Sequence, residues 1–515
     1  AVAIAAHPPS PGNRTPLGPL PAMRKRPASA TGLGAESQQV GKRPAAHASG
    51  ALADVPCTAP GSEEPARILR GPAAQSDAQL SSLGAALRGG RLVAFPTETV
   101  YGLGANGLDA TAVLKIFEAK GRPLNDPCIL HVPGVEEGLQ LLDLSALEQA
   151  VFKALTAAVW PGPLSVVGRA RPSVPREVTA QTDFVAVRCP NHPLALRLLQ
   201  AAAVPVAAPS ANRFGHISPT CADHVFEDLS HVSGLQILDG GSCGVGIEST
   251  VVKLDLEHSR VLVLRKGGTT REQLEAALAK GAAEGLFNGT QVTVEYHRPH
   301  AATSSRSHSN GSYVAQMTTS PDSTPTAATP SVTKPAAIDK LSASDEKREP
   351  DHETEAQQAP GMMLRHYAPS VPTYLLSQDA IGPEAGGSVP SHLGSPARSV
   401  LIDFSGRLRQ HQALFLRCFD LCGAGAGAAA VHAAEGAEAE EACRYVFAVL
   451  REAEAFAQAN EAEVICLADF ATGGLQGSFA EALHDRLFRA ASGRSAGLRL
   501  LEGRCAGEAA QLVVA

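Results

Sequence analysis

Short apolar runs alternate with amphipathic stretches through the middle of the chain. The apolar runs have the length of buried strands, and several stop at Pro, Gly or a group of polar residues. We expect strands at residues 91–95, 128–132, 164–168, 184–188, 204–208, 235–238, 250–254 and 261–264. Helical spacing of apolar residues predicts helices at 144–159, 193–202 and 271–280, the last with a capping box of Thr269 and Glu272. The alternation predicts a sheet with helices, in the α/β or α+β class.

A further helix is expected between Asp109, a suitable N-cap, and Gly121, a common helix stop. Lys120 and Arg122 therefore flank the C-terminus of this helix. Such cations often do no more than complement the helix dipole. Arg122, however, lies beyond the helix in the loop GRPLNDP, where its guanidinium is free to bind a phosphate through two nitrogen atoms.

Polar residues follow two of the predicted strands directly. Pro96 ends the run 91–95, because proline cannot donate to a sheet ladder, and a Thr-Glu-Thr turn including Thr99 follows it. Ser210 and Asn212 follow the run 204–208 on alternate positions, so both face one side if the chain stays extended. Ser and Asn also commonly do no more than form a turn. Together, the two strand ends predict the polar wall of a cleft.

Composition and charge narrow the class of protein. The chain has 515 residues, enough for two or three domains, and 44% are hydrophobic, which suits a folded core. The formal charge of -7 argues against a chain that wraps nucleic acid along its length, although a small charged substrate remains compatible. No apolar run approaches eighteen residues, so we expect no membrane span. The scattered cysteines indicate neither a zinc site nor a disulfide framework, which favours a reducing compartment.

Two segments have the composition of disordered chain. Residues 1–75 are rich in Ala, Pro, Ser and Gly and carry few acids, and we interpret them as a disordered N-terminal extension. Low acidity together with Arg and Ser also fits an organelle transit peptide. A plain disordered extension is the simpler interpretation, so we expect a cytoplasmic protein, with a mitochondrial or other organelle pool left open. Residues 286–360, rich in Ser, Thr, Pro and His, are expected to form a solvated linker or insertion.

Four short motifs carry a family resemblance. FPTETVYGLG, KGR-P, PSAN and GIEST, spread over residues 91–267, together resemble the YrdC-like family of threonylcarbamoyl-adenylate synthases. GMMLRHYAPSVPTYLL, at 361–376, resembles the start of the smaller C-terminal domain in the longer, two-domain members. The resemblance implies a catalytic domain at 76–285 with a twisted mixed sheet around a concave basic pocket. It also implies a lid motif at 361–371 and a small Rossmann-like α/β domain at 372–515, for which we expect strands at 399–404 and 464–468 and a helix at 479–491.

The resemblance also implies a reaction. In the family, L-threonine, bicarbonate and ATP form threonylcarbamoyl-AMP and pyrophosphate, and a separate transfer complex uses the product to modify tRNA next to the anticodon. Stable direct tRNA binding is not expected, nor is membrane attachment. The chain has no GxxxxGK[ST] loop, so scattered side chains must hold the phosphates. We expect Mg²⁺ to bridge the phosphates of ATP with mostly water and substrate as ligands, without a protein metal cage.

Site residues follow from these motifs. The catalytic candidates are Lys120, Arg122, Ser210 and Asn212. By resemblance, the residues that contact ATP are Lys120, Arg122, Asp126, Ser210, Asn212, Thr220, Arg265 and the lid residue Tyr367. Those that contact threonine are Thr99, His131, Arg188 and Ser249. Arg188 suits a carboxylate because its guanidinium binds two oxygens at once.

Several alternatives stay open for individual residues. Arg188 by itself could form a surface ion pair, and His131 could be an ordinary core histidine. The loop PLNDP departs from the family order, so Asn125, Asp126 or neither contacts ATP. LRKG stands where LRPG is common, although the arginine is kept. No spacing argument separates Glu98 and Glu248 as general base or magnesium ligand, and a dedicated base could be absent.

Two other functions compete with the synthase. A non-catalytic RNA-binding regulator could use the same basic cavity, but the acidic chain and the lack of an aromatic stacking platform weigh against it. A carbamoyl-transfer module for hydrogenase maturation would share the fold. That architecture should carry additional zinc-finger-like cysteine clusters, which this chain lacks.

Overall fold

The computed structural model describes residues 64–297, 357, 363–364, 366–382, 392–422, 437–470, 477–500 and 510–514. Most of the extension expected at 1–75 and of the linker expected at 286–360 lies outside these residues. None of the helices in the described ranges has the length and apolar character that a membrane crossing requires.

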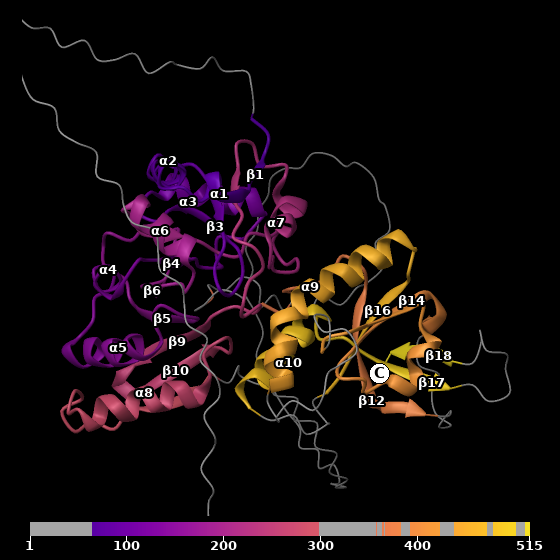
Figure 1. The fold of residues 1–515 in the computed structure, drawn as a ribbon. Coiled ribbons are helices and arrows are strands. Elements are labelled where there is room, and N and C mark those ends of the chain that lie inside the picture. Colours follow the sequence, from indigo (N-terminus) through magenta and orange to yellow (C-terminus); the bar gives the residue numbers. More distant parts are fainter. Residues whose placement is uncertain are drawn as a thin grey trace, which may run out of the picture. The chain divides into compact units, whose positions relative to one another are not determined.

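Residues 64–297 build an eleven-stranded sheet (Figure 1). In spatial order its strands are β1 (Arg67–Leu69), β8 (Gln236–Leu238), β2 (Val93–Phe95), β3 (Gly102–Asn106), β7 (Val206–Ala207), β4 (Ile129–His131), β6 (Phe184–Arg188), β5 (Leu164–Arg169), β9 (Thr250–Asp255), β10 (Arg260–Arg265) and β11 (Thr293–Tyr296). The helices are α1 (Gly71–Ala74), α2 (Asp77–Arg88), α3 (Ala110–Lys120), α4 (Val135–Leu139), α5 (Ala146–Val159), α6 (Pro193–Ala202), α7 (Ala222–Leu229) and α8 (Arg271–Ala283), with a 3-10 turn at Leu256–His258. Parallel pairs such as β4 with β6 adjoin antiparallel pairs such as β5 with β6, which confirms the mixed sheet.

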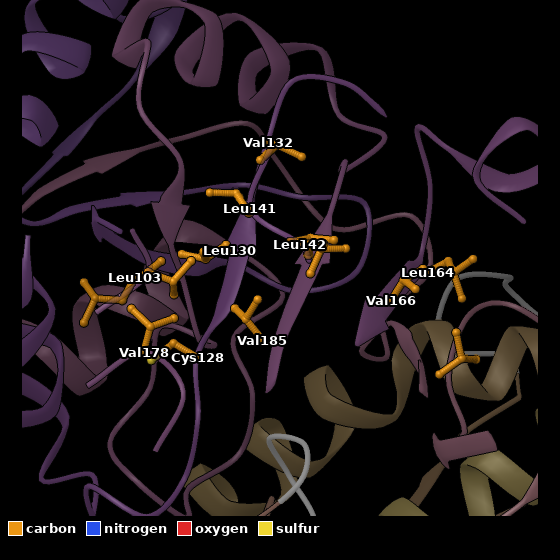
Figure 2. Packing of buried hydrophobic residues seen from close by; sticks show 14 of the residues in the cluster. Leu103, Cys128, Leu130, Val132, Leu141, Leu142, Leu164, Val166, Val178 and Val185 are labelled. Atoms are coloured by element: carbon orange, nitrogen blue, oxygen red, sulfur yellow. The ribbon is translucent and has the colours of Figure 1, made fainter. Parts of the chain in front are cut away.

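A continuous apolar core lies between this sheet and its helices. Figure 2 shows Leu103, Leu130, Val166 and Val185 from four of the strands within one buried cluster. All four are at most 2% exposed. Burial of such side chains stabilises the fold by about 1.5–3 kcal/mol each, so the strands are held by the core as well as by their ladders.

Helix α3 begins and ends where the sequence predicted. The Asp109 carboxylate accepts hydrogen bonds from the backbone amides of Thr111 and Ala112, at 2.9 and 3.3 Å. Gly121 adopts φ +65°, the left-handed conformation that closes many helices. The loop that carries Arg122 therefore starts at a fixed point.

The sheet also contains strands that the sequence did not predict. The segment GLGAN, for which no element was expected, forms β3 because it pairs with β2 in the register Ala94 to Leu103. β1 and β11 pair with β8 and β10 and lie outside the range 76–285 in which we expected the catalytic domain. All three are short or glycine-rich segments that become strands through partners distant in sequence.

The predicted capping box of helix α8 was wrong by one residue. Thr270 is the N-cap, and its side chain accepts from the amide of Gln273, whose side chain accepts from Thr270 in return. Thr269 instead donates from its hydroxyl to the carbonyl of Pro163 at 3.0 Å. Because Thr269 binds Pro163, the adjacent Thr270 caps the helix.

The C-terminal half of the chain forms a second, seven-stranded sheet. Its spatial order is β13 (His392–Gly394), β18 (Ala510–Val514), β17 (Ser495–Leu500), β12 (Thr373–Gly382), β16 (Val464–Ala468), β14 (Ser399–Asp403) and β15 (Arg417–Asp420). Its helices are α9 (Ala437–Ala459) and α10 (Ser478–Ala490), with 3-10 turns at Pro396–Arg398 and Arg409–Leu414. The five strands from β17 to β15 run parallel. The Rossmann-like assignment of this half stays a prediction.

Alternate residues of the second sheet enter two different cores. Helices α9 and α10 pack on one face of this sheet (Figure 1). Val400, Ile402 and Ile465 belong to the core on that face, whereas Leu401 and Cys466 belong to the core on the other face. This alternation follows from the two-residue repeat of a strand. The core beneath α9 and α10 also takes in three buried side chains from the first half of the chain, which are Val100, Ile217 and Ile247.

Candidate active site

A cavity of about 40 Å³ opens where several strands of the first sheet end. Its walls come from the Thr-Glu-Thr turn, from β4 and β6, from the loop after β7, from the segments flanking β9 and β10, and from the segment before β12. The lining includes Thr97, Arg122, His131, Arg188, Ser210, Glu248, Ser249, Arg265 and His366. Six of these residues were predicted from sequence to bind substrates, which are Arg122, His131, Arg188, Ser210, Ser249 and Arg265.

Arg188 ends β6 and is tied to the Thr-Glu-Thr turn. One terminal nitrogen of its guanidinium lies 2.8 Å from the Glu98 carboxylate and 2.8 Å from the Thr99 hydroxyl, to which it donates. The arginine is 4% exposed, so this is a buried ion pair and not a surface one. Buried Nε of Arg188 and Oε2 of Glu98 have no hydrogen-bond partner among the described residues. Both atoms therefore keep capacity for a ligand.

His131 lies beside Arg188, because β4 and β6 pair in parallel with these two residues in register. Burial first, and then the charge of Arg188, lower the pKa of His131 to about 3. The ring is therefore neutral at physiological pH and can offer a hydrogen bond without adding charge. Its Nδ1 is 3.3 Å from the carbonyl oxygen of Ile129, and its ring packs edge-on against Phe95.

Ser249 and Arg265 form a second polar wall. The Arg265 guanidinium donates to the Ser249 carbonyl at 3.0 Å and to the Ser249 hydroxyl at 3.2 Å. The same hydroxyl lies 2.8 Å from that of Ser165. Burial lowers the pKa of Arg265, with nearby Arg486 and Arg188 acting in the same direction, yet an arginine keeps its charge.

Lys120 and Arg122 take different places, although both flank the end of α3. Lys120 does not line the cavity; its ammonium lies behind the loop that carries Ser210 and donates to that residue's carbonyl at 2.6 Å. Arg122 lines the cavity, and its guanidinium pairs with Asp126 Oδ2 at 3.1 Å and donates to the Pro127 carbonyl at 2.6 Å. Burial and the charge of Arg122 lower the pKa of Lys120 to about 7.

Five other predicted residues are buried but do not line the cavity, namely Thr99, Asp126, Asn212, Thr220 and Tyr367. Thr99 and Asp126 each bind a lining arginine, as described above. Asn212 donates from its side-chain amide to the carbonyls of Arg213 and His216, both at 2.8 Å, while its buried Oδ1 has no partner among the described residues. Thr220 contacts His224 near the start of α7, and Tyr367 packs against Phe447.

Three of these lining residues, Thr97, Glu248 and His366, were not among the residues predicted to bind a substrate. His366 precedes Tyr367 in RHYAP, and its ring lies 6.4 Å from that of Phe214, measured between centroids. Burial, followed by the charge of Arg122, lowers its pKa well below the ordinary value. Glu248 was considered only as a base or metal ligand, and both of its carboxylate oxygens are engaged, by the Ser218 hydroxyl at 2.7 Å and by Arg486 at 3.2 Å.

The cavity is therefore cationic and small. Arg122, Arg188 and Arg265 line it together with Glu248, and Glu98 reaches it only through its ion pair with Arg188. No group of three or more His, Cys, Asp or Glu side chains suited to a metal ion occurs in the described ranges. The three arginines of this cavity suit an anionic ligand.

Comparison with known proteins shows the family of the chain. A family model described as "Telomere recombination", for the Sua5, YciO and YrdC proteins, matches residues 85–267. A second, described as "Threonylcarbamoyl-AMP synthase, C-terminal domain", matches residues 332–492. A putative threonylcarbamoyl-AMP synthase from Mycobacterium tuberculosis is 35% identical over 213 residues, which cover 41% of this chain and 94% of that protein. The chain belongs to the Sua5/YciO/YrdC family.

Other members of the Sua5/YciO/YrdC family extend the likeness. Threonylcarbamoyl-AMP synthase from Bacillus subtilis is 46% identical over 206 residues, covering 39% of this chain and 57% of that protein. The matched part spans about half the length of such two-domain relatives. The crystal structure of Pyrococcus abyssi Sua5 complexed with L-threonine is 28% identical with a TM-score of 0.54, and the match covers 83% of this chain and 96% of that one. This structural match includes the second sheet as well as the first.

Proposed function

We propose that the chain is a threonylcarbamoyl-AMP synthase. It joins L-threonine, bicarbonate and ATP into threonylcarbamoyl-AMP and releases pyrophosphate. The observation that carries this proposal is the convergence of Arg122, Arg188 and Arg265, each at most 8% exposed, on one cavity. Buried cations placed in advance are what an adenylation needs, because negative charge moves onto the departing pyrophosphate. The L-threonine in the related Pyrococcus abyssi structure supports the choice of substrate.

Threonine is assigned to the wall made by Arg188, Thr99, His131 and Ser249. The free Nε of Arg188 suits the substrate carboxylate, and neutral His131 suits a neutral partner. Glu98 Oε2 is the buried carboxylate oxygen that remains open to the amine or to its proton, since both oxygens of Glu248 are engaged. The neutral amine attacks bicarbonate with loss of water, and proximity contributes most to this step.

ATP is assigned to the wall made by Arg122, Ser210 and Arg265. An oxygen of the carbamate attacks the α-phosphorus, and pyrophosphate leaves. Lys120 acts through the loop, since it fixes the carbonyls of Ser210 and Asn212 and so orients both side chains. Asp126 acts on ATP through Arg122. Asn212, Thr220 and Tyr367, which the resemblance also assigns to ATP, lie off the cavity lining and support it from behind. Mg²⁺, whose donors here would be the phosphates and water, would neutralise phosphate charge.

One assay tests this function. Purified protein with ATP, Mg²⁺, bicarbonate and L-threonine should release pyrophosphate, and the release should depend on both threonine and bicarbonate. Arg122→Ala and Ser210→Ala should abolish turnover with unchanged circular dichroism. Arg169→Ala, at an exposed arginine of β5, should remain fully active. Pyrophosphate release that does not depend on threonine and bicarbonate would rule out the synthase function.

The product and the location complete the proposal. Threonylcarbamoyl-AMP would pass to a separate tRNA threonylcarbamoyl-transfer complex, without stable tRNA binding by this chain. We place this chemistry in the cytoplasm. The domain bounds at 76–285 and 372–515 serve as working limits, with the observed strands β1 and β11 added to the first.

A further inference from the structure

Arg486, on helix α10 of the C-terminal half, contacts Glu248, which lines the cavity. Its side chain is fully buried, and its Nε donates to Oε2 of Glu248 at 3.2 Å. Neighbouring Asp485 lies 3.2 Å from one terminal nitrogen, and the other terminal nitrogen has no partner among the described residues. Removing a guanidinium from water is costly, and here the cost is offset by its pairing with the carboxylates of Glu248 and Asp485.

The same guanidinium holds the segment before β12. It lies 5.5 Å from the centroid of the Tyr367 ring, a cation–π contact, and Phe447 of α9 packs on that ring at 5.1 Å between centroids. Tyr367 adopts φ +61°, a left-handed conformation that a bulky residue keeps only where its surroundings enforce it. Its neighbour His366 lines the cavity, and Ala368 donates from its amide to the carbonyl of Gly215 at 2.9 Å.

We propose that Arg486 is a positioning residue through which the C-terminal half completes the active site. It orients the Glu248 carboxylate with one edge and clamps Tyr367 with its face, and so keeps His366 over the cavity. This proposal rests on the synthase function above. Arginine is required rather than lysine, because the planar fork can meet a carboxylate and an aromatic face together.

The first test measures the yield of product per pyrophosphate released. The full chain is compared with Arg486→Met and Arg486→Lys, and with Arg444→Met, which removes another arginine contact between the two halves, at the carbonyl of Gly244. A loose lid admits water to a hydrolysable adenylate, so Arg486→Met should lower the yield severalfold and Arg486→Lys should restore little of it. A smaller folded fraction would change the rate but not this ratio. Unchanged yield in both Arg486 variants would overturn the proposal.

The second test does not depend on activity. Hydrogen exchange is followed in peptides covering residues 366–376 of the same four proteins. Both Arg486 variants should exchange about tenfold faster there, whereas Arg444→Met should match the parent chain, since local opening governs exchange. If the parent chain makes no threonylcarbamoyl-AMP, the proposed function fails, and this exchange result still judges the clamp. Equal exchange in all four proteins would refute it, and if Arg486→Met does not fold, Arg486→Lys alone gives the answer.

Discussion

The ammonium of Lys120 donates a hydrogen bond of 2.6 Å to the backbone carbonyl of Ser210. A second hydrogen bond joins it to the carbonyl of Asn212. The end of helix α3 and the Ser-x-Asn loop are therefore connected by a buried cation rather than by apolar packing alone. Because this cation has lost its water, its charge depends on what the neighbouring cavity holds.

Lys120 should take up a proton when ATP binds. Its pKa of about 7 in the free protein leaves it mostly neutral at pH 8, and phosphate anions nearby raise that pKa. Calorimetry at pH 8 in buffers of different ionisation enthalpy should show proton uptake, and ATP affinity should weaken as pH rises through about 7. Lys120→Met should remove both effects. Lys115→Met, at a lysine of the same helix that binds the Gly90 carbonyl, should keep them; uptake that persists without Lys120 would assign the proton elsewhere.

The parts of this site that sequence could predict are those set by local pattern. The strand ending at Arg188, the helix from Pro193 to Ala202 and the cap at Asp109 follow from periodicity and capping within a few residues. The strand Gly102–Asn106 was not expected, because a short glycine-containing segment has little strand pattern of its own and becomes a strand by pairing with β2. The contacts of the site residues could not be predicted either, because some join distant parts of the chain. Glu248, for example, binds Arg486, which lies 238 residues away.

Arg188→Lys should raise the KM for L-threonine about tenfold or more while leaving the KM for ATP nearly unchanged. Lysine keeps the charge but cannot bind Glu98, Thr99 and a substrate carboxylate through one planar group. Steady-state pyrophosphate release gives both constants. Arg169→Lys, an exposed arginine on β5, serves as the matched control and should match the parent chain. A rise in the ATP constant alone would move Arg188 to the other wall.

His216 should make the stability of the protein depend on pH. Its imidazole lies 2.9 Å from both Asp228 and Glu454, with Arg451 and Arg213 also bound to Asp228. Burial lowers the pKa of His216, but the hydrogen bonds to the two carboxylates outweigh it and raise the pKa above 6.5.

A histidine pKa that is raised by folding stabilises the folded state fully below the unfolded value, and this stabilisation is lost as pH rises through the raised pKa. The midpoint temperature of thermal unfolding should therefore decrease as the pH rises from 6 to 8.5. The fall should be smaller in His216→Gln, which keeps a donor but cannot be protonated. An equal fall in both proteins would show that other groups carry the dependence.

Gly267→Ala should disrupt the site through the backbone. A Cβ at Gly267 would lie 2.3 Å from the Glu248 carbonyl oxygen and 2.5 Å from the carbonyl carbon of Ser249, so the segment that carries both lining residues must shift. Overpacking of this kind costs about 1–3 kcal/mol. Gly244→Ala is the matched control, because a Cβ there meets nothing within 4 Å. The midpoint temperature of unfolding and the rate of pyrophosphate release should both decrease in Gly267→Ala and stay unchanged in Gly244→Ala. Full activity of Gly267→Ala would mean that Glu248 and Ser249 need not hold their observed positions.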